Sequence, residues 1–363
     1  MQTTANETER FVESSLPPSS PSTSPGEGVD EEIPSIDVGR LLLLAAAYVI
    51  GTLGIFGNAV VIYVCIRFPL RGITNILVCN QSLIDFFSSF FFLLRYGVVT
   101  NAPAQANSAL SDFVCKFWIS EYPIWALAVA STVNLVYLTI ERYIAVFHPI
   151  VYRLKLTPFR VKLFAILPWI FGLLHELPWS VTHNVSLDNE CFQQWWTPEV
   201  GFIIGCIVPV DHYILPLAVI GFVYTRILLK LRLVGPTTEI AAGTARERNN
   251  RNYSEKASRN VIKTMFAVSL TYMICWGPNE ILYFYSNLGG KVDWNGLFYY
   301  YTVVSALCNM CVNPFIYACH YQDFRAKLGK IWRRCRRGLR GDTNGETSEA
   351  SLAQSVSGSV ANT

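Results

Sequence analysis

The sequence predicts an all-α membrane protein, a bundle of seven transmembrane helices followed by a short amphipathic eighth helix. Of its 363 residues, 52% are hydrophobic and only 15% are charged. A soluble domain of this length would need more charge to cover its surface. The apolar residues also gather in long runs, as a membrane-spanning chain requires.

Seven of these runs reach the length of a membrane-spanning helix, about 20 residues. They cover residues 41–66, 73–98, 113–147, 161–181, 200–231, 261–287 and 297–319. The third and the fifth are long enough to tilt or to project beyond the hydrocarbon. A polar and charged segment, residues 235–258, forms the one long connection.

These runs divide the chain into four predicted parts. They are a disordered extracellular N-terminus (1–40), a seven-helix transmembrane domain (41–320), an amphipathic membrane-parallel helix (321–336) and a disordered cytoplasmic tail (337–363). Both ends hold too few apolar residues to form a core. Because no secretory signal peptide is visible, we expect the first span to serve as its own insertion signal.

The basic residues predict the orientation, since cytoplasmic loops carry the excess of Lys and Arg. With the N-terminus outside, 24 of the 29 basic residues face the cytoplasm. The other five are Arg10, Arg40, Arg95, Lys116 and Lys291. We therefore expect a multi-pass protein of the plasma membrane with an extracellular N-terminus and a cytoplasmic C-terminus.

Sequons and cysteines fit this orientation. Asn6 and Asn184 lie outside, where glycosylation is possible, whereas the sequon at Asn252 lies inside. Cys115 and Cys191 both lie on the oxidising side, so a disulfide between them is plausible, the alternative being two free thiols. Seven cysteines inside apolar runs are expected to be packing residues: Cys65, Cys79, Cys206, Cys275, Cys308, Cys311 and Cys319. No spacing of a zinc site occurs, and no metal is expected beyond a possible sodium ion.

Polar residues inside the spans are functional candidates, because burying them in a membrane is costly. Asp85 lies about 18 Å along the second helix. Asn58, Ser131, Asn309 and Asn313 lie at comparable depths. One carboxylate with several neutral oxygens suits a small hard cation such as sodium. A hydrogen-bonded network around a protonated Asp85 is the alternative, and the sequence favours neither.

The third span ends in Glu141-Arg142-Tyr143, about 40 Å of helix beyond Cys115. An arginine beside an acid at the membrane boundary can be held by that acid or released to a partner, although it can also be a simple interfacial pair. Prolines interrupt several spans and are expected to bend them. They are Pro168, Pro178, Pro209, Pro216, Pro278 and Pro314.

Together these residues resemble the rhodopsin-like class of G-protein-coupled receptors, over about residues 41–335 and with one signature in each helix. The residues that carry the resemblance are Gly57-Asn58, Asp85, Cys115, Glu141-Arg142-Tyr143, Trp169 with Pro178, Cys191, Pro216 with Tyr224, Cys275-Trp276-x-Pro278, Asn313-Pro314-x-x-Tyr317 and Asp323-Phe324-Arg325. Within this class the chain resembles neuropeptide receptors.

The resemblance implies a mechanism. Arg142 would contact the G protein after the sixth helix swings about Pro278, Trp276 would sense the ligand, and Tyr224 and Tyr317 would stabilise the open form. Asp85, Asn58, Ser131, Asn309 and Asn313 match the family's sodium pocket. Ile150 would enter a G protein pocket, Cys335 is a candidate for palmitoylation, and serines and threonines of the tail are candidates for the phosphorylation that recruits arrestin.

The sequence departs from the family pattern at three places. Cys115 and Arg142 are 27 residues apart instead of the usual 25, which implies a bulge or a cysteine displaced into the loop. Ser258 replaces the acid that often pairs with the arginine, so basal activity is expected to be raised. Thr132 and Tyr272 replace the usual aliphatic residue and phenylalanine of the core.

The outer half of the spans excludes two ligand classes. An amine receptor would carry an Asp where this chain has Ile124, and an opsin would carry a lysine where it has Leu307. The ligand-binding candidates are Glu121, Ile124, Glu176, Asp211, His212, Trp276, Asn279, Glu280 and Tyr283. Their mixture of acids and aromatics favours a short peptide with a basic or amidated end, with a lipid or another small non-amine molecule as the alternative.

Other functional classes are disfavoured by the same sequence. A transporter would show duplicated broken helices, which we do not find. An enzyme would need a constellation such as HExxH or GxSxG, and neither occurs. We expect no nucleic-acid partner.

Overall fold

The computed structural model describes residues 38–68, 72–98, 109–186, 190–233, 245–294 and 296–339. Within these ranges seven helices are long and apolar enough to cross a membrane. They are Leu41–Arg67, Ile73–Tyr96, Ala109–Phe147, Pro158–Val181, Pro198–Lys230, Arg259–Asn287 and Leu297–His320. Each lies within a few residues of a predicted run, so the seven-helix prediction is confirmed.

The spans are built from shorter elements, because several of them contain π-helical turns or breaks. The helices are α2 (Val38–Arg67), α3 (Ile73–Phe92), η1 (Leu93–Val98), α4 (Ala109–Phe113), η2 (Val114–Ile119), α5 (Tyr122–Phe147), α6 (Pro149–Lys155), α7 (Pro158–Phe164), α8 (Leu167–Val181), α9 (Pro198–Pro209), η3 (Val210–Ile214), α10 (Leu215–Leu233), α11 (Ala245–Asn287), α12 (Leu297–His320) and α13 (Gln322–Leu339). The strands β1 (His183–Val185) and β2 (Cys191–Gln193) pair antiparallel.

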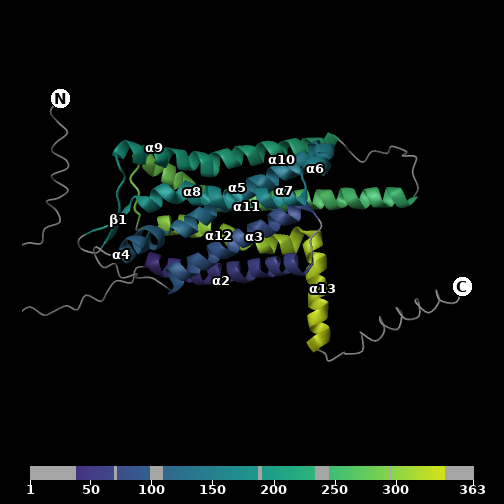
Figure 1. The fold of residues 1–363 in the computed structure, drawn as a ribbon, viewed down its shortest axis with the longest axis horizontal. Helices are drawn as coiled ribbons and strands as arrows, with labels where there is room; N and C mark the ends of the chain where they lie inside the picture. The colour runs from purple at the N-terminus through teal and green to yellow at the C-terminus, as the bar shows by residue number, and fades with distance from the viewer. Residues whose placement is uncertain are drawn as a thin grey trace, which may run out of the picture. The chain divides into compact units, whose positions relative to one another are not determined.

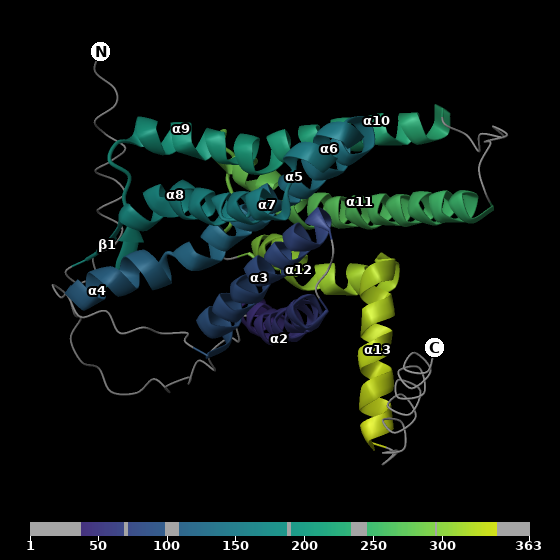
Figure 2. The same ribbon diagram turned by 45° about the vertical axis from the view of Figure 1, so that its right-hand side comes forward.

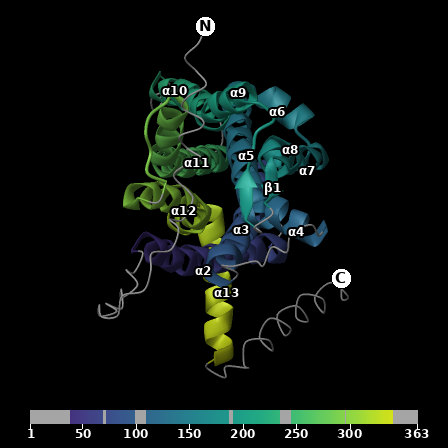
Figure 3. The same cartoon turned by 90° about the vertical axis from the view of Figure 1, so that its left-hand side faces the viewer.

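The seven spans pack as a bundle in which α5 contacts α3, α8, α10 and α11 (Figures 1 and 3). One end of the bundle carries α4 and the β1–β2 hairpin, and we call it the hairpin end (Figure 1). The opposite end carries α6 and α13, and we call it the α13 end. The eighth helix α13 runs across the direction of the spans (Figure 2), the direction of a helix that lies along a membrane surface.

Three π-helical turns occur in the described spans, and they change which side chains face the bundle interior. η3 directly follows Pro209, whose missing N–H removes a helical hydrogen bond. η2 contains Cys115 and is followed by Glu121, the one described non-glycine residue with a left-handed backbone (φ 60°). The extra residues between Cys115 and Arg142 are therefore taken up by a bulge within the span, the first of the two predicted alternatives.

The long connection between the fifth and sixth spans is shorter than predicted. Residues 245–258, expected to belong to it, continue α11 as helix. Eight of these 14 residues are Ala, Arg, Glu or Lys, which favour a helix, and none is Gly or Pro, so the segment can continue the helix in spite of its polarity. The side chain of Ser258 lies outside the described residues.

Two disulfides are present among the described cysteines. The predicted bond between Cys115 and Cys191 joins η2 to β2. A second bond joins Cys65 of α2 to Cys79 of α3, whose Cα atoms are 6.4 Å apart. The prediction that both are merely packing residues is therefore wrong, because it considered each apolar run alone and α2 and α3 bring the two thiols face to face.

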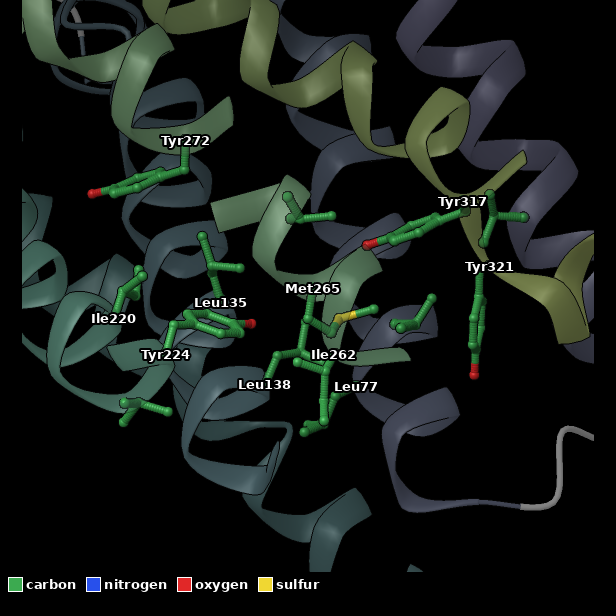
Figure 4. Packing of buried hydrophobic residues seen from close by; sticks show 14 of the residues in the cluster. Leu77, Leu135, Leu138, Ile220, Tyr224, Ile262, Met265, Tyr272, Tyr317 and Tyr321 are labelled. Carbon is green, nitrogen blue, oxygen red and sulfur yellow. The ribbon is translucent and has the colours of Figure 1, made fainter. Parts of the chain in front are cut away.

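The main apolar cluster lies toward the α13 end and joins residues of at least five spans (Figure 4). Leu135 and Leu138 of α5 contribute to it, together with Ile220 of α10 and Met265 of α11. The rings of Tyr224 and Tyr317 enter from opposite sides, with Met265 between them (Figure 4). Both tyrosines are buried, so polar hydroxyls lie within otherwise apolar packing.

Candidate functional site

At the α13 end, Glu141 and Arg142 form the centre of a buried polar group. Their side chains make an ion pair, and Glu141 also accepts hydrogen bonds from Thr74 (3.0 Å) and Tyr152 (2.6 Å). The same two hydroxyls accept hydrogen bonds from Arg142. These partners of Arg142 lie on α3, α5 and α6, so the arginine is held from several sides at once.

Tyr152 is a permanent donor in this group. Burial, followed by the negative charge of Glu141, raises the pKa of Tyr152 to about 12. The hydroxyl therefore keeps its proton at any physiological pH and continues to donate to the carboxylate. Nearby, Tyr143 stacks on Phe147, and Ile150 is 73% exposed beyond the end of α5.

In the middle of the bundle, Asp85 receives three side-chain donors. Ser131 and Gln81 donate to Oδ1 at 3.0 and 3.1 Å, and Asn313 donates to Oδ2 at 2.7 Å. Gln81 also accepts a hydrogen bond from Asn134 at 2.8 Å. The carboxylate is thus surrounded by neutral amide and hydroxyl groups from three helices.

The same region keeps amide oxygens that have no donor. Asn58 donates to the carbonyls of Gly54 and Met310, both at 2.9 Å. The side-chain oxygens of Asn58, Asn309 and Asn313 are buried without a hydrogen-bond partner. A carboxylate with unpartnered amide oxygens is a donor set that a small hard cation accepts, so the residues present fit sodium.

Nearer the hairpin end, His212 and Glu280 form a buried pair between η3 and α11. Nδ1 of His212 lies 2.7 Å from Oε1 of Glu280, and both residues are 5% exposed. The Thr132 hydroxyl, which donates to the carbonyl of Ala128, lies 3.1 Å from Nε2 of His212. Both ring nitrogens of His212 therefore have a polar partner.

This pair lies against Trp276. The His212 ring meets the indole edge-on, with 4.6 Å between the ring centroids. On its other side Trp276 meets Trp125 at 6.2 Å. The Tyr272 hydroxyl donates to the backbone carbonyl of His212. A change at Glu280 or His212 must therefore repack the tryptophan that the family resemblance assigns to ligand sensing.

The acids Glu176 and Asp211 are not grouped with Glu280. Instead they bind the two ring nitrogens of His175, Nδ1 to Glu176 at 2.9 Å and Nε2 to Asp211 at 3.0 Å. Consecutive residues of a helix point in different directions, so Asp211 faces α8 while His212 faces α11. The sequence placed the three acids in one outer region, and the structure divides them between two clusters.

A cavity of about 550 Å³ lies between α2, η1, α5 and α12 toward the hairpin end, and we call it the peptide cavity after the ligand proposed below. Its lining combines one ion pair with several aromatic rings: Arg95, Tyr96, Glu121, Trp125, Trp294, Tyr299 and Tyr300. Arg95 lies 3.8 Å from Glu121. Glu121 also accepts hydrogen bonds from Tyr96 and from the Trp125 indole (3.3 Å).

The remaining predicted site residues lie around these groups. Ile124 is buried in an apolar cluster with Leu307, Asn279 donates to Thr302 at 3.3 Å, and Tyr283 lies on α11. Pro278 and Pro314 lie inside α11 and α12. Asn184 lies in β1 and Cys335 is an exposed free thiol of α13. Asn6 and the phosphorylation candidates of the tail lie outside the described residues.

Several residues of these groups were not predicted. Gln81 was detectable, because it lies four residues before Asp85 and therefore on the same face of the helix. His175 is next to Glu176 in the sequence, but only the packing of α8 against η3 gives it a role. Thr74, Tyr152 and Tyr96 carry no sequence signal of their own.

Comparisons with known proteins agree with this arrangement. Residues 57–317 match the family described as 7 transmembrane receptor (rhodopsin family). The chain is 29% identical to the substance-P receptor of Mus musculus over 311 residues, 82% of this chain and 72% of that receptor. It is 29% identical to the neuromedin-K receptor of Oryctolagus cuniculus over 310 residues, 82% of this chain and 62% of that receptor.

Proposed function

Because the chain belongs to the rhodopsin family of seven-transmembrane receptors, we propose that it recognises an extracellular peptide and activates a heterotrimeric G protein. It is a multi-pass membrane receptor, and its family is a receptor family and not an enzyme family. The relatives named above are receptors for substance P and neuromedin K, which are peptides. The G protein would bind at the α13 end.

The observation that carries the peptide proposal is the cavity of about 550 Å³ at the hairpin end. Ligand sites typically combine a mostly apolar and aromatic lining with a few placed polar groups. Here Glu121 can accept a hydrogen bond from a basic or amide group, Arg95 can donate to a carbonyl or carboxylate, and Tyr299 offers an aromatic face. A short peptide presents all three kinds of group.

Calcium and cAMP responses of cells that express the chain test this proposal. Substance P, neuromedin K and a library of short amidated peptides are applied, and we expect at least one peptide to activate. Glu121→Gln should lower the potency of that peptide about tenfold, as loss of one charged contact does. Surface expression of the receptor should be unchanged. A response to lipids alone, with none to any peptide, would overturn the proposal.

Orientation belongs to the same proposal. The extracellular placement of the hairpin end is supported by the 24 of 29 basic residues that then face the cytoplasm. We also propose the plasma membrane as the site of action, palmitoylation at Cys335 and arrestin binding to the phosphorylated tail. An epitope placed before Val38 should be stained on intact cells, and one placed after Thr363 only on permeabilised cells.

Release of Arg142 is proposed as the activating step, and Glu141 as the residue that restrains it. Glu141→Gln removes the charge that holds the arginine while keeping the side chain's shape. A shift of about 1.4 kcal/mol toward the released form corresponds to a roughly tenfold rise in basal activity. Nucleotide exchange on the G protein, measured in membranes without ligand, reports this rise. The matched control Glu199→Gln alters an exposed acid of α9 and should leave basal activity unchanged; equal rises in both variants would contradict the proposed restraint.

We propose that a sodium ion binds to Asp85 and stabilises the receptor. Ser131 and the side-chain oxygens of Asn58, Asn309 and Asn313 would be its further ligands. Purified receptor in sodium chloride should unfold at a higher temperature than in potassium chloride of equal ionic strength. At ten times the dissociation constant the gain is about 1.4 kcal/mol. Asp85→Asn should abolish the difference between the two salts. If the parent chain melts identically in both, the residues form only the hydrogen-bonded network.

A further inference from the structure

A second cavity, of about 220 Å³, lies between α5, α8 and the η3–α10 span, away from the peptide cavity. Its walls are apolar and include Val129, Val133 and Val219. Two residues of its lining, Phe171 and Leu215, are 47% and 57% exposed on the outside of the bundle. In a membrane-spanning bundle such outward apolar side chains face lipid, so the cavity opens to the hydrocarbon.

Four polar residues contribute to this mostly apolar lining, and we call them the floor of the cavity. They are His175, Asp211, His212 and Thr132. Oδ2 of Asp211 is bound to His175, while Oδ1 is buried and has no hydrogen-bond partner. A carboxylate oxygen without a donor is costly in a low-dielectric environment, so a donor brought beside Asp211 would be stabilised.

The cluster of His175, Glu176 and Asp211 is also negatively charged. Both ring nitrogens of His175 bond to carboxylate oxygens, which requires at least two protons in the cluster. Either the imidazole carries both of them, or it carries one and a carboxyl group carries the other. In both cases the net charge is −1. Among the residues that line this cavity, none is a lysine or an arginine that would cancel that charge.

We propose that this cavity is a binding site for a compact lipophilic amine that enters from the membrane. Its N–H donors would bond Asp211, and its apolar part would fill the space between the valines and Leu215. The volume is below the range of about 300–1,000 Å³ typical of drug-sized ligands, so the ligand is small. The site is separate from the proposed peptide site and does not depend on the identity of the peptide.

The cavity is positioned to influence the receptor. Its floor contains His212, which contacts Trp276 and pairs with Glu280. An occupant beside His212 would therefore act on Trp276, which also meets Trp125 of the peptide cavity. Whether it favours the resting or the active form depends on which form it binds more tightly.

Photolabelling of the full chain in lipid vesicles tests the proposal. The probe is a short alkylamine that carries a diazirine and a terminal alkyne, and matched probes carry a hydroxyl or a carboxylate in place of the amine. We expect the amine to label peptides of α5, α8 or α10 around the cavity, and the carboxylate to label them roughly tenfold less. Equal labelling by all three probes would mean that the cavity takes any chain without recognising the head group, and would overturn the proposal.

Two variants locate the labelling. Asp211→Asn removes the charge, and Leu215→Trp fills the mouth while leaving every polar group in place; each should reduce labelling by the amine roughly tenfold or more. Leu229→Trp, at a lipid-exposed position of the same helix, should label like the parent chain. Undiminished labelling in both Asp211→Asn and Leu215→Trp would overturn the proposal. Because labelling needs no signalling, a failure of the peptide proposal would leave this result unaffected.

Discussion

Glu280→Leu is expected to lower the free energy of unfolding by about 3 kcal/mol, as breaking a buried pair from one side does. The substitution leaves Nδ1 of His212 buried with no partner, because the other nitrogen is already bound to Thr132. Thermal unfolding with a thiol-reactive fluorophore is a suitable measurement once the exposed thiols of Cys319 and Cys335 have been blocked, since Cys275 and Cys311 are buried free thiols that react only after unfolding.

Glu280→Gln is the matched control. The glutamine amide can either donate to Nδ1 of His212 or accept from it, so the hydrogen bond is kept. We therefore expect a loss of only about 1 kcal/mol. The double variant His212→Phe, Glu280→Leu removes both polar partners and should recover part of the stability that Glu280→Leu loses. If all three variants melted alike, the pair would contribute nothing beyond its volume.

The number and limits of the spans could be predicted from the sequence because a bilayer imposes a length and an apolar composition on each helix. The buried polar residues could be predicted for a related reason: Asp85, Arg142 and Asn313 stand out because a membrane tolerates such residues only with partners. The partners themselves were harder to predict. Gln81 follows from helical periodicity alone, whereas Thr74 and Tyr152 reach Glu141 only through the packing of α3 and α6 against α5.

The division of the acids into two clusters could not be predicted. It depends on how far each helix is rotated about its own axis, and the π-helical turn η3 changes that rotation within one span. The sequence alone does not indicate that Asp211 binds His175 while its neighbour binds Glu280. The disulfide between Cys65 and Cys79 escaped prediction for the same reason, since pairing across helices is a property of their relative placement.

Gly172→Ala is expected to destabilise the bundle by about 2–3 kcal/mol, because the backbone of α5 lies directly against this residue of α8. A Cβ atom at Gly172 would overlap the carbonyl oxygen of Ala126 and lie 3.0 Å from the backbone nitrogen of Ala130. Backbone atoms cannot rotate away as a side chain can, so α8 as a whole would have to shift.

That shift would also separate the valines of α5 from Phe171 and so change the lipid-facing cavity. Gly221→Ala is the control within the same bundle, because a Cβ atom there meets nothing within 4 Å. In a helix interior alanine is favoured over glycine by about 0.5–1 kcal/mol, so this variant should melt at the same temperature as the parent or slightly above it. Both variants add one methyl group to a helical glycine, and only at Gly172 does a neighbouring backbone face that group. Thermal unfolding of the two variants therefore measures the effect of the close packing. A Gly172→Ala variant as stable as Gly221→Ala would mean that α5 and α8 do not pack this closely.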